Sequence, residues 1–311
     1  MTRPRTYQTE AIIIKKTKLG EADRILTLYT PGLGKIQAVA KGVRRPKSKM
    51  AGHLELLTHS QVSLARGRNL DIITGSQTID SFLPLKTDLW LASYGLYVIE
   101  LVNQFTPDQA EDEALFRLLL ETLTSLCMSD NRAPSTSSGQ APSTSSGQAP
   151  STSSGQAPST SSLDFAQDSS GQALLLRYFE MKLLDMAGFR PQLQACVACR
   201  QPLAPVVNSF SANSGGMLCP LCAGKQPFAY AISVNALKVL RFIQENGFDA
   251  VSRLKISPAL ARELEAVTRH YLRYLLEREV KSAAWLDTLR DQLGKPPPAG
   301  EPETSAVEAE H

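Results

Sequence analysis

Four cysteines in two closely spaced pairs constrain the fold of this chain more than any other feature of its sequence. Cys196-Val-Ala-Cys199 and Cys219-Pro-Leu-Cys222 each place two residues between their cysteines, and nineteen residues separate the pairs. A two-residue gap lets both sulfur atoms of a pair face one ion, and two such pairs at this spacing are typical of a four-thiolate zinc site. The sequence therefore predicts a zinc ribbon.

Four thiolates complete the tetrahedral coordination of zinc and leave no open position. The expected Zn²⁺, held by Cys196, Cys199, Cys219 and Cys222, is therefore structural and not catalytic. Two alternatives stay open for the pairs: disulfide bonds, which a reducing cytosol disfavours, and thioredoxin-type redox chemistry, for which one pair would suffice. Cys127 stands alone in an apolar helical pattern and is expected to be a small core residue.

We recognise no export signal in the N-terminal residues. Residues 1–10 include basic side chains, but the apolar run Ala11–Ile14 is too short for a signal peptide or a membrane span. We therefore expect a cytoplasmic protein without membrane contacts.

The charge of the chain is divided unevenly along its length. Residues 1–80 contain fourteen Lys or Arg and six Asp or Glu, a net charge of +8, whereas the remaining residues contain 19 and 24, a net charge of −5. The whole chain of 311 residues carries only +3. A basic N-terminal part on a mildly acidic body predicts that a polyanion binds the first part and that the second part has other contacts.

The basic part also has the pattern of a small all-β domain. Its β-branched and apolar runs cover residues 9–16, 24–30, 35–41, 54–65 and 70–79, with turn signals such as Pro31-Gly-Leu-Gly34 between them. Five short strands in so short a segment predict a closed barrel, for which the OB-fold is the commonest choice. We expect this DNA-binding domain to span residues 1–82.

From Pro84 onward, apolar residues recur at helical spacing. The segments with this pattern are residues 85–102, 115–126, 173–187, 234–243 and 259–276. The predicted fold class is therefore α+β multidomain, with an N-terminal OB-fold barrel followed by a mainly α-helical domain that carries the four-cysteine zinc ribbon. The helical domain is expected in two parts, residues 83–132 and 173–294, with the zinc knuckles at 196–222.

An eight-residue repeat separates these two helical parts. Ala133-Pro-Ser-Thr-Ser-Ser-Gly-Gln140 recurs twice, and a fourth copy from Ala157 is interrupted by Leu163–Asp168. The unit has no apolar side chain larger than that of alanine, so it cannot build a packed solenoid. Its composition predicts a disordered insert over residues 133–172, either an inert linker or a functional tether. The tail, residues 295–311, is Pro-rich and then acidic and is also expected to be disordered.

Positive charge is most concentrated in the segment Gly34–Lys49, which has six cations and no acid. Such a loop beside a barrel sheet can follow a phosphate backbone; the alternative is a solvated loop that only aids solubility. Two further arginines flank Gly67 in a predicted turn. The predicted nucleic-acid contacts are Lys35, Lys41, Arg44, Arg45, Lys47, Lys49, Arg66 and Arg68.

Aromatic residues are scarce in the basic part, where Tyr7 and Tyr29 are the only ones. Because proteins hold unpaired bases by stacking them on aromatic rings, binding is expected to depend on phosphates and to show little sequence preference. Neutralisation of roughly five phosphates predicts a log–log salt slope of about −3.5 on single strands.

A second group of cations, Arg262, Arg269 and Arg273, shares one face of the predicted helix at residues 259–279. Two interpretations remain for this stripe. It is either a solvated charged face, in which Glu265 pairs with Arg269, or a dock for an acidic peptide or for DNA.

The sequence offers no catalytic constellation. Gly32-Leu-Gly-Lys35 departs from the Walker A motif, because a single residue separates its glycines and Ile36 follows the lysine. His53-Leu-Glu55 matches the H-x-E of zinc deaminases, but neither cysteine pair has the preceding proline that those enzymes require. We therefore expect a protein that is not an enzyme.

Apart from the insert and the tail, the chain resembles the RecO family of bacterial recombination-mediator proteins. The N-terminal motifs that carry the resemblance are Glu10-Ala-Ile-Ile-Ile-Lys15, Gly20-Glu-Ala-Asp-Arg-Ile25, Leu28-Tyr-Thr-Pro31 and Ala40-Lys-Gly-Val-Arg-Arg-Pro-Lys-Ser48. Those of the C-terminal half are Arg177-Tyr-Phe-Glu-Met-Lys-Leu-Leu184, Gly188, the two cysteine pairs and Leu275-Leu-Glu-Arg-Glu-Val-Lys-Ser282.

This resemblance implies a function in DNA repair and recombination. RecO-like proteins bind single- and double-stranded DNA, anneal complementary strands, engage the acidic tail of single-strand-binding protein and join RecR in loading RecA onto gaps. By position, the resemblance implies that the cations between Lys35 and Lys49 form the DNA surface. Because some members lack the cysteines, it also implies that zinc only supports the fold.

Two further hypotheses belong to other classes. An RNA-associated zinc-ribbon binding protein with a basic OB barrel would show a strong preference for RNA in competition binding. A metal-dependent enzyme is the third hypothesis, and the complete four-cysteine set argues against it.

Overall fold

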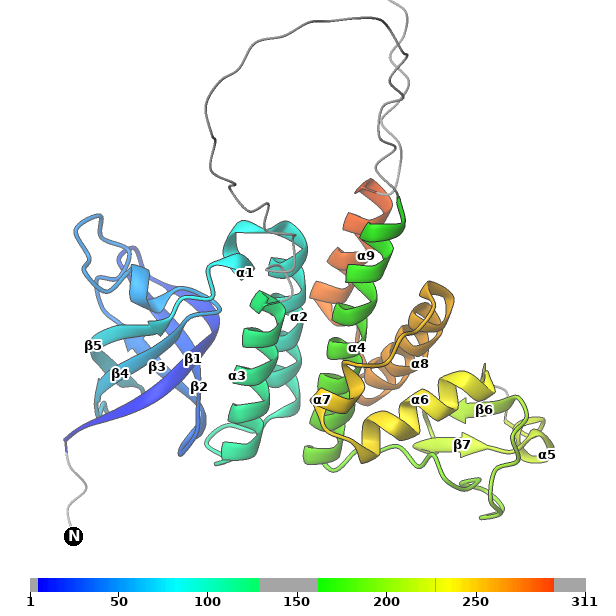
Figure 1. The fold of residues 1–311 in the computed structure, drawn as a ribbon. Coiled ribbons are helices and arrows are strands. Elements are labelled where there is room, and N and C mark those ends of the chain that lie inside the picture. The colour runs from blue at the N-terminus through cyan, green and yellow to red at the C-terminus, as the bar shows by residue number, and fades with distance from the viewer. Residues whose placement is uncertain (1–4, 129–161, 227, 294–311) are drawn as a thin grey trace, which may run out of the picture.

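The computed structural model describes residues 5–128, 162–226 and 228–293. Figure 1 shows a β-barrel at one end, a helical body in the middle and a small sheet at the other end. This architecture confirms the predicted fold class. The disorder expected for most of the repeat and for the tail falls on residues outside the described ranges.

The N-terminal part is a closed, OB-like barrel of five strands in the order β1-β2-β3-β5-β4. The strands are β1 Thr6–Leu19, β2 Asp23–Thr30, β3 Gly34–Ala40, β4 His59–Ala65 and β5 Asp71–Asp80. Thr6–Ile12 of β1 pairs with β4, and Ile12–Leu19 pairs with β2, with an irregularity in the register between Ile13 and Lys15. A short parallel pairing of β3 with β5 closes the ring.

The apolar run in β1 is buried on both faces of the strand. Ala11 and Ile13 lie in the core of the barrel, whereas Ile12 and Ile14 lie in the core of the helical body, together with Tyr29 of β2. This division follows from the strand geometry, because successive side chains point to opposite faces. The apolar run Ala11–Ile14 therefore contributes side chains to both the barrel core and the helical core.

The strand expected at residues 54–65 begins only at His59. Before it, the chain forms the short 3-10 helix η1, Gly52–Leu54, and a turn in which Leu57 adopts a positive φ of 58°. Leu54 is buried in the barrel core, and Leu57 is buried in the helical core. This segment therefore closes one end of the barrel instead of extending a strand.

The body consists of helices packed around one apolar core. They are α1 Pro84–Thr87, α2 Leu89–Phe105, α3 Glu113–Met128, α4 Ser162–Met186, α6 Val234–Glu245, α7 Phe248–Val251, α8 Pro258–Leu276 and α9 Lys281–Leu293. The helix expected at residues 85–102 is interrupted at Asp88, whose backbone is extended and whose carboxylate accepts the N–H of Leu91. Asp88 thereby caps α2 and separates it from α1.

Helix α4 begins within the segment that the sequence analysis assigns to the repeat insert. The helix starts at Ser162, so the last part of the segment 133–172 is helical. Residues 162–172 contain no proline and only one glycine, whereas each repeat unit contains both residues. Proline and glycine are the strongest helix breakers, and the helix begins where the repeat is lost.

The zinc-ribbon region forms a three-stranded sheet in the order β7-β6-β8. Its elements are β6 Asn208–Ser211, β7 Gly216–Leu218, the short helix α5 Pro220–Ala223 and β8 Tyr230–Ile232. The sheet packs on the helical body through buried Phe210 and Met217. The ring of Phe210 lies 5.3 Å from that of Tyr271 in α8, in an edge-on arrangement.

A buried polar cluster ties α2 to α4. The hydroxyl of Tyr97 donates to Oε1 of Glu180 (2.6 Å), and the same carboxylate pairs with Arg177 one turn earlier in α4. Arg177 and Glu180 are almost completely buried. Burial, and then the charge of Glu180, raise the pKa of Tyr97 well above its ordinary value, so its hydroxyl keeps its proton.

None of the helices in residues 5–128, 162–226 and 228–293 combines the length and the apolar character that a bilayer crossing needs.

Candidate nucleic-acid interface and metal centre

Five of the predicted cations lie in the loop that joins β3 to β4. We name these residues the basic rim: Lys41, Arg44, Arg45, Lys47 and Lys49. All five are exposed. Within the described ranges, no carboxylate forms an ion pair with any of them.

The base of this loop is anchored to the turn between β1 and β2. The backbone N–H of Arg44 donates to Ala22 O (3.0 Å), and its guanidinium donates to Gly20 O (3.2 Å). The backbone N–H of Gly42 donates to the carboxylate of Asp23 (2.7 Å). The loop is therefore held at its start, while the cationic side chains remain exposed.

Apolar residues of the same loop fill one end of the barrel. Val43 and Leu54 are buried in the barrel core, and Met50 and Ala51 pack against it. These packed residues flank the exposed run 44–47 and thus hold the basic rim on the outer side of the segment.

Lys35 does not belong to the basic rim, because its side chain makes contacts within the protein. Its ammonium donates to the carbonyl oxygens of Asn103 (2.9 Å) and Thr106 (2.6 Å) and lies 3.3 Å from the carboxylate of Asp108. Its side chain is only 12% exposed. Because α2 ends at Phe105, the ammonium satisfies carbonyls that the helix leaves unpaired and complements the negative end of its dipole.

The neighbouring glycine completes this junction between the barrel and the helical body. Gly34 has a φ of +61°, and a Cβ atom there would lie 1.8 Å from Ala110 O. The backbone N–H of Gln109 donates to Lys35 O (2.8 Å). The segment after α2 can therefore approach β3 only because residue 34 has no side chain.

Replacing Lys35 with glutamine is expected to lower the melting temperature without changing how DNA affinity depends on salt. Hydrogen bonds from a charged donor contribute roughly 1.5–3 kcal/mol, which corresponds to a fall of about 5 °C for a protein of this size. The matched control is Lys47→Gln, which should weaken DNA binding and leave the melting temperature unchanged. Thermal unfolding and binding titrations would check both variants, and equal losses of affinity would contradict the assignment of Lys35.

Arg66 and Arg68 form a second cationic site, away from the basic rim. Both are exposed in the turn between β4 and β5. The backbone N–H of Arg66 donates to Arg5 O (2.9 Å), which places this turn beside the start of β1. The basic rim is anchored beside the other end of β1. The structure therefore does not bring these two arginines together with the loop that they were expected to extend.

Neither aromatic ring of the barrel is free to stack on a base. Tyr29 is completely buried. The hydroxyl of Tyr7 donates to Asp71 (2.5 Å), and the guanidinium of Arg66 lies 4.9 Å from the centre of its ring. This arrangement supports the prediction that phosphates dominate binding.

Two arginines of the stripe on α8 pair with acids in the segment after α8 and in α9. Arg269 pairs with Glu279 (3.4 Å) and with Asp287 of α9 (2.5 Å), and Arg273 also pairs with Glu279. Glu265, which was expected to pair with Arg269, pairs with an arginine of α9 instead. The sequence pattern did not reveal α9, so these partners could not be anticipated.

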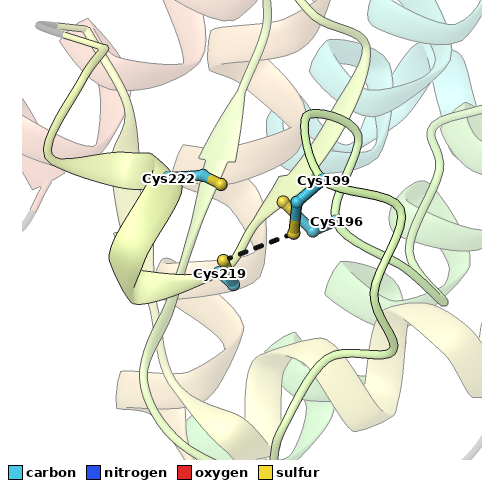
Figure 2. Close-up of side chains that lie close together, drawn as sticks. All are labelled: Cys196, Cys199, Cys219 and Cys222. Atoms are coloured by element: carbon cyan, nitrogen blue, oxygen red, sulfur yellow. Dashed lines mark hydrogen bonds between the residues drawn. The ribbon is translucent and has the colours of Figure 1, made fainter.

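The four predicted metal ligands converge in the ribbon. Figure 2 shows the side chains of Cys196, Cys199, Cys219 and Cys222 directed toward one another, and all four sulfur atoms lie within 4.8 Å of one another. Sγ of Cys199 lies 3.9 Å from Sγ of Cys219. Zinc–sulfur bonds of about 2.3 Å in a tetrahedron give sulfur–sulfur distances of about 3.8 Å. The donor set and its spacing fit a metal such as zinc.

Strand β7 brings the two cysteine pairs together. The segment that leads to the first pair runs beside β7, where the N–H of Met217 donates to Gln192 O (2.9 Å) and the N–H of Val197 donates to Met217 O (2.8 Å). A Cβ atom on Gly216 would lie 2.5 Å from Gln192 O. The second pair follows β7 directly, with Cys219 at the start of α5. The knuckles therefore meet because both flank one strand.

The thiols of this cluster have opposite pKa shifts. Burial raises the pKa of Cys196, but hydrogen bonds from the backbone of Cys199, Cys219 and Ala198 outweigh it and lower the value to about 6. The hydrogen bond with Cys219, followed by burial, raises the pKa of Cys222 to about 12.

Cys127 is separate from this cluster, as the sequence indicated. It is half-buried in α3 and packs against the helical core. Burial raises the pKa of its thiol to about 11.

Two family matches cover most of the chain. Residues 1–82 match the family described as "Recombination protein O N terminal". Residues 86–137 and 159–284 match the family described as "Recombination protein O C terminal". The interval that the second match omits falls within the eight-residue repeat.

Curated proteins named "DNA repair protein RecO" are similar to this chain along nearly all of its length. The protein of Dehalococcoides mccartyi is 44% identical over 290 residues, which cover 93% of this chain and 98% of the relative. The protein of Roseiflexus is 39% identical over 299 residues, covering 96% and 90%. The protein of Symbiobacterium thermophilum is 31% identical over 286 residues, covering 91% and 98%.

Proposed function

Because this chain belongs to the RecO family of DNA repair proteins, we propose that it is a recombination mediator that acts by binding DNA and not by catalysis. In this proposal it binds single- and double-stranded DNA and anneals complementary strands. With RecR it helps to load RecA onto gaps coated with single-strand-binding protein, whose acidic tail it engages. It performs this role in the cytoplasm, in association with the nucleoid.

The observation that carries this proposal is the exposed basic rim. Five cations in one short loop repel one another, and within the described ranges no carboxylate offsets that repulsion. A phosphate backbone would relieve it and release counterions, which is the main source of affinity in non-specific DNA binding. The anchored base of the loop supports a preformed surface.

Annealing activity requires that bases stay accessible while the repulsion between two backbones is reduced. The barrel offers cations but no free aromatic ring on which a base could stack. A strand held by its phosphates would therefore keep its bases free to pair. The second cationic site, Arg66 and Arg68, would allow a further backbone segment to bind at the other end of β1.

For the metal centre we propose one structural zinc ion per chain. When bound, zinc would supply a closed four-sulfur coordination that holds the two cysteine knuckles together. The chain's own contribution lies in the packing of Phe210 and Met217 against the helical body, which makes the ribbon part of the core. The ion would therefore stabilise the half of the protein that supports the barrel.

The test of the proposed function is the annealing of complementary strands that are coated with single-strand-binding protein, without nucleotide. The protein should accelerate annealing, and a variant with all five rim cations replaced by glutamine should not. No acceleration by the natural protein, or a requirement for ATP, would exclude the proposal. A strong preference for RNA in competition binding would favour the RNA-associated alternative.

A further inference from the structure

Two cations face each other across the hairpin of β1 and β2. Lys18 and Arg24 are direct partners in the register of these antiparallel strands. Directly opposed residues project their side chains to the same side of a sheet at close range. Like charges in such positions destabilise a hairpin. The chain therefore carries a local repulsion near the tip of this hairpin.

In the part of the chain that the structure describes, no acidic side chain pairs with either of these two cations. Lys16 lies on the same strand face two residues before Lys18, and it pairs with Glu55. Within the described ranges, neither Lys18 nor Arg24 forms an ion pair. The nearest acid in β2, Asp23, is the adjacent residue, so it points to the other face, and its carboxylate accepts the N–H of Gly42.

The pair also lies next to the basic rim. Arg24 is opposite Ala40 in the register of β2 and β3, and Ala40 immediately precedes the rim loop. Arg44 is hydrogen-bonded to both Gly20 and Ala22, in the turn between Lys18 and Arg24. Lys18 is exposed and Arg24 is half-buried. The opposed pair therefore lies where the hairpin of β1 and β2 meets the start of the rim loop.

We propose that Lys18 and Arg24 clamp a backbone phosphate of the bound nucleic acid and so extend the basic rim onto the hairpin of β1 and β2. This inference rests on the proposed function, because it adds contacts to the same interface. A phosphate between the two side chains would turn their repulsion into two attractive contacts. The pair is thus unfavourable in the free protein and favourable in the complex.

This reasoning predicts opposite effects on stability and on binding. Lys18→Gln with Arg24→Gln removes the repulsion, so the melting temperature should be equal to that of the natural protein or higher. The same variant should bind a fluorescein-labelled oligodeoxythymidylate about tenfold more weakly at about 0.1 M salt, with a log–log salt slope flatter by about 1.4. Fluorescence anisotropy and thermal unfolding of the full chain measure both quantities.

Two further variants make the test specific. Arg253→Gln with Lys255→Gln removes the same two charges from exposed positions in the helical body, and it should leave the affinity nearly unchanged. Lys18→Glu places a carboxylate opposite Arg24, so it should raise the melting temperature and weaken binding.

The inference is overturned if the Lys18 and Arg24 variant binds as tightly as the Arg253 and Lys255 control, or if its melting temperature falls. Arg44→Ala with Arg45→Ala separates this failure from a failure of the proposed function. If that rim variant loses affinity while the hairpin variant does not, the rim binds DNA and the clamp does not exist. If neither variant loses affinity, the proposed interface itself is wrong.

Discussion

Replacing Cys196 with serine should remove the metal and lower the melting temperature of the protein by at least about 10 °C. Structural zinc sites contribute roughly 10–16 kcal/mol of binding free energy, and that energy is available only to the folded ribbon. Cys196 is buried at the centre of the cluster. Because Phe210 and Met217 of the ribbon belong to the helical core, loss of the ribbon should expose that core.

Metal analysis and thermal unfolding of freshly purified protein measure this effect. The natural protein should contain about one zinc ion per chain, and the variant almost none. Cys127→Ser is the matched control, because it removes a thiol that lies outside the cluster, and it should keep the zinc. A natural protein without metal, or a Cys196→Ser variant as stable as the control, would contradict the proposed role of the site.

The second large effect is expected from Arg44→Ala combined with Arg45→Ala. Loss of two phosphate contacts should weaken single-strand binding by about tenfold or more at about 0.1 M salt and flatten the salt slope by about 1.4. The loss should be the same on every sequence, because phosphate contacts carry no sequence information. Both side chains are exposed, and the only side-chain hydrogen bond that they form within the described ranges joins Arg44 to Gly20 O at the surface, so the melting temperature should fall only slightly.

Binding titrations on homopolymeric and mixed-sequence strands, repeated across salt concentrations, would check this result. Arg253→Gln with Lys255→Gln again provides the control for net charge. An unchanged affinity would remove the loop from the interface, and a loss confined to one sequence would show that bases and not phosphates are recognised.

The features that the sequence predicted well depend on local patterns. The spacing of the cysteines predicted the four-cysteine cluster, because two short knuckles need only one strand, β7, to bring them together. The alternation of apolar residues and the glycine-rich turns predicted the five strands of the barrel. In both cases the residues that determine the structure are close to one another in the chain.

The role of Lys35 could not be predicted in this way. In the sequence it begins a run of cations, and nothing near it distinguishes it from Lys41. Its partners, Asn103, Thr106 and Asp108, follow it by about seventy residues and reach it only because α2 ends beside β3. The Gly34 that permits this approach was interpreted as part of a turn.

Helix α9 is another feature that the sequence pattern did not reveal. Four of its apolar residues are consecutive, Ala283–Leu286, so the helical spacing is not distinct in the sequence. Its position depends on contacts with distant residues, such as the bonds from the N–H groups of Lys281 and Ser282 to Glu100. The pairs of Arg269 with Asp287 and of Glu265 with α9 depend on the same packing.

The most direct test of the central claim, that the basic rim holds nucleic-acid backbones, is the salt dependence of single-strand affinity. It should be measured for the natural protein and for a variant in which all five rim cations are glutamine. If each rim cation neutralises one phosphate, the log–log slope of the natural protein should be steeper by about 3.5 than that of the variant. Identical slopes for two equally well folded proteins would contradict the claim.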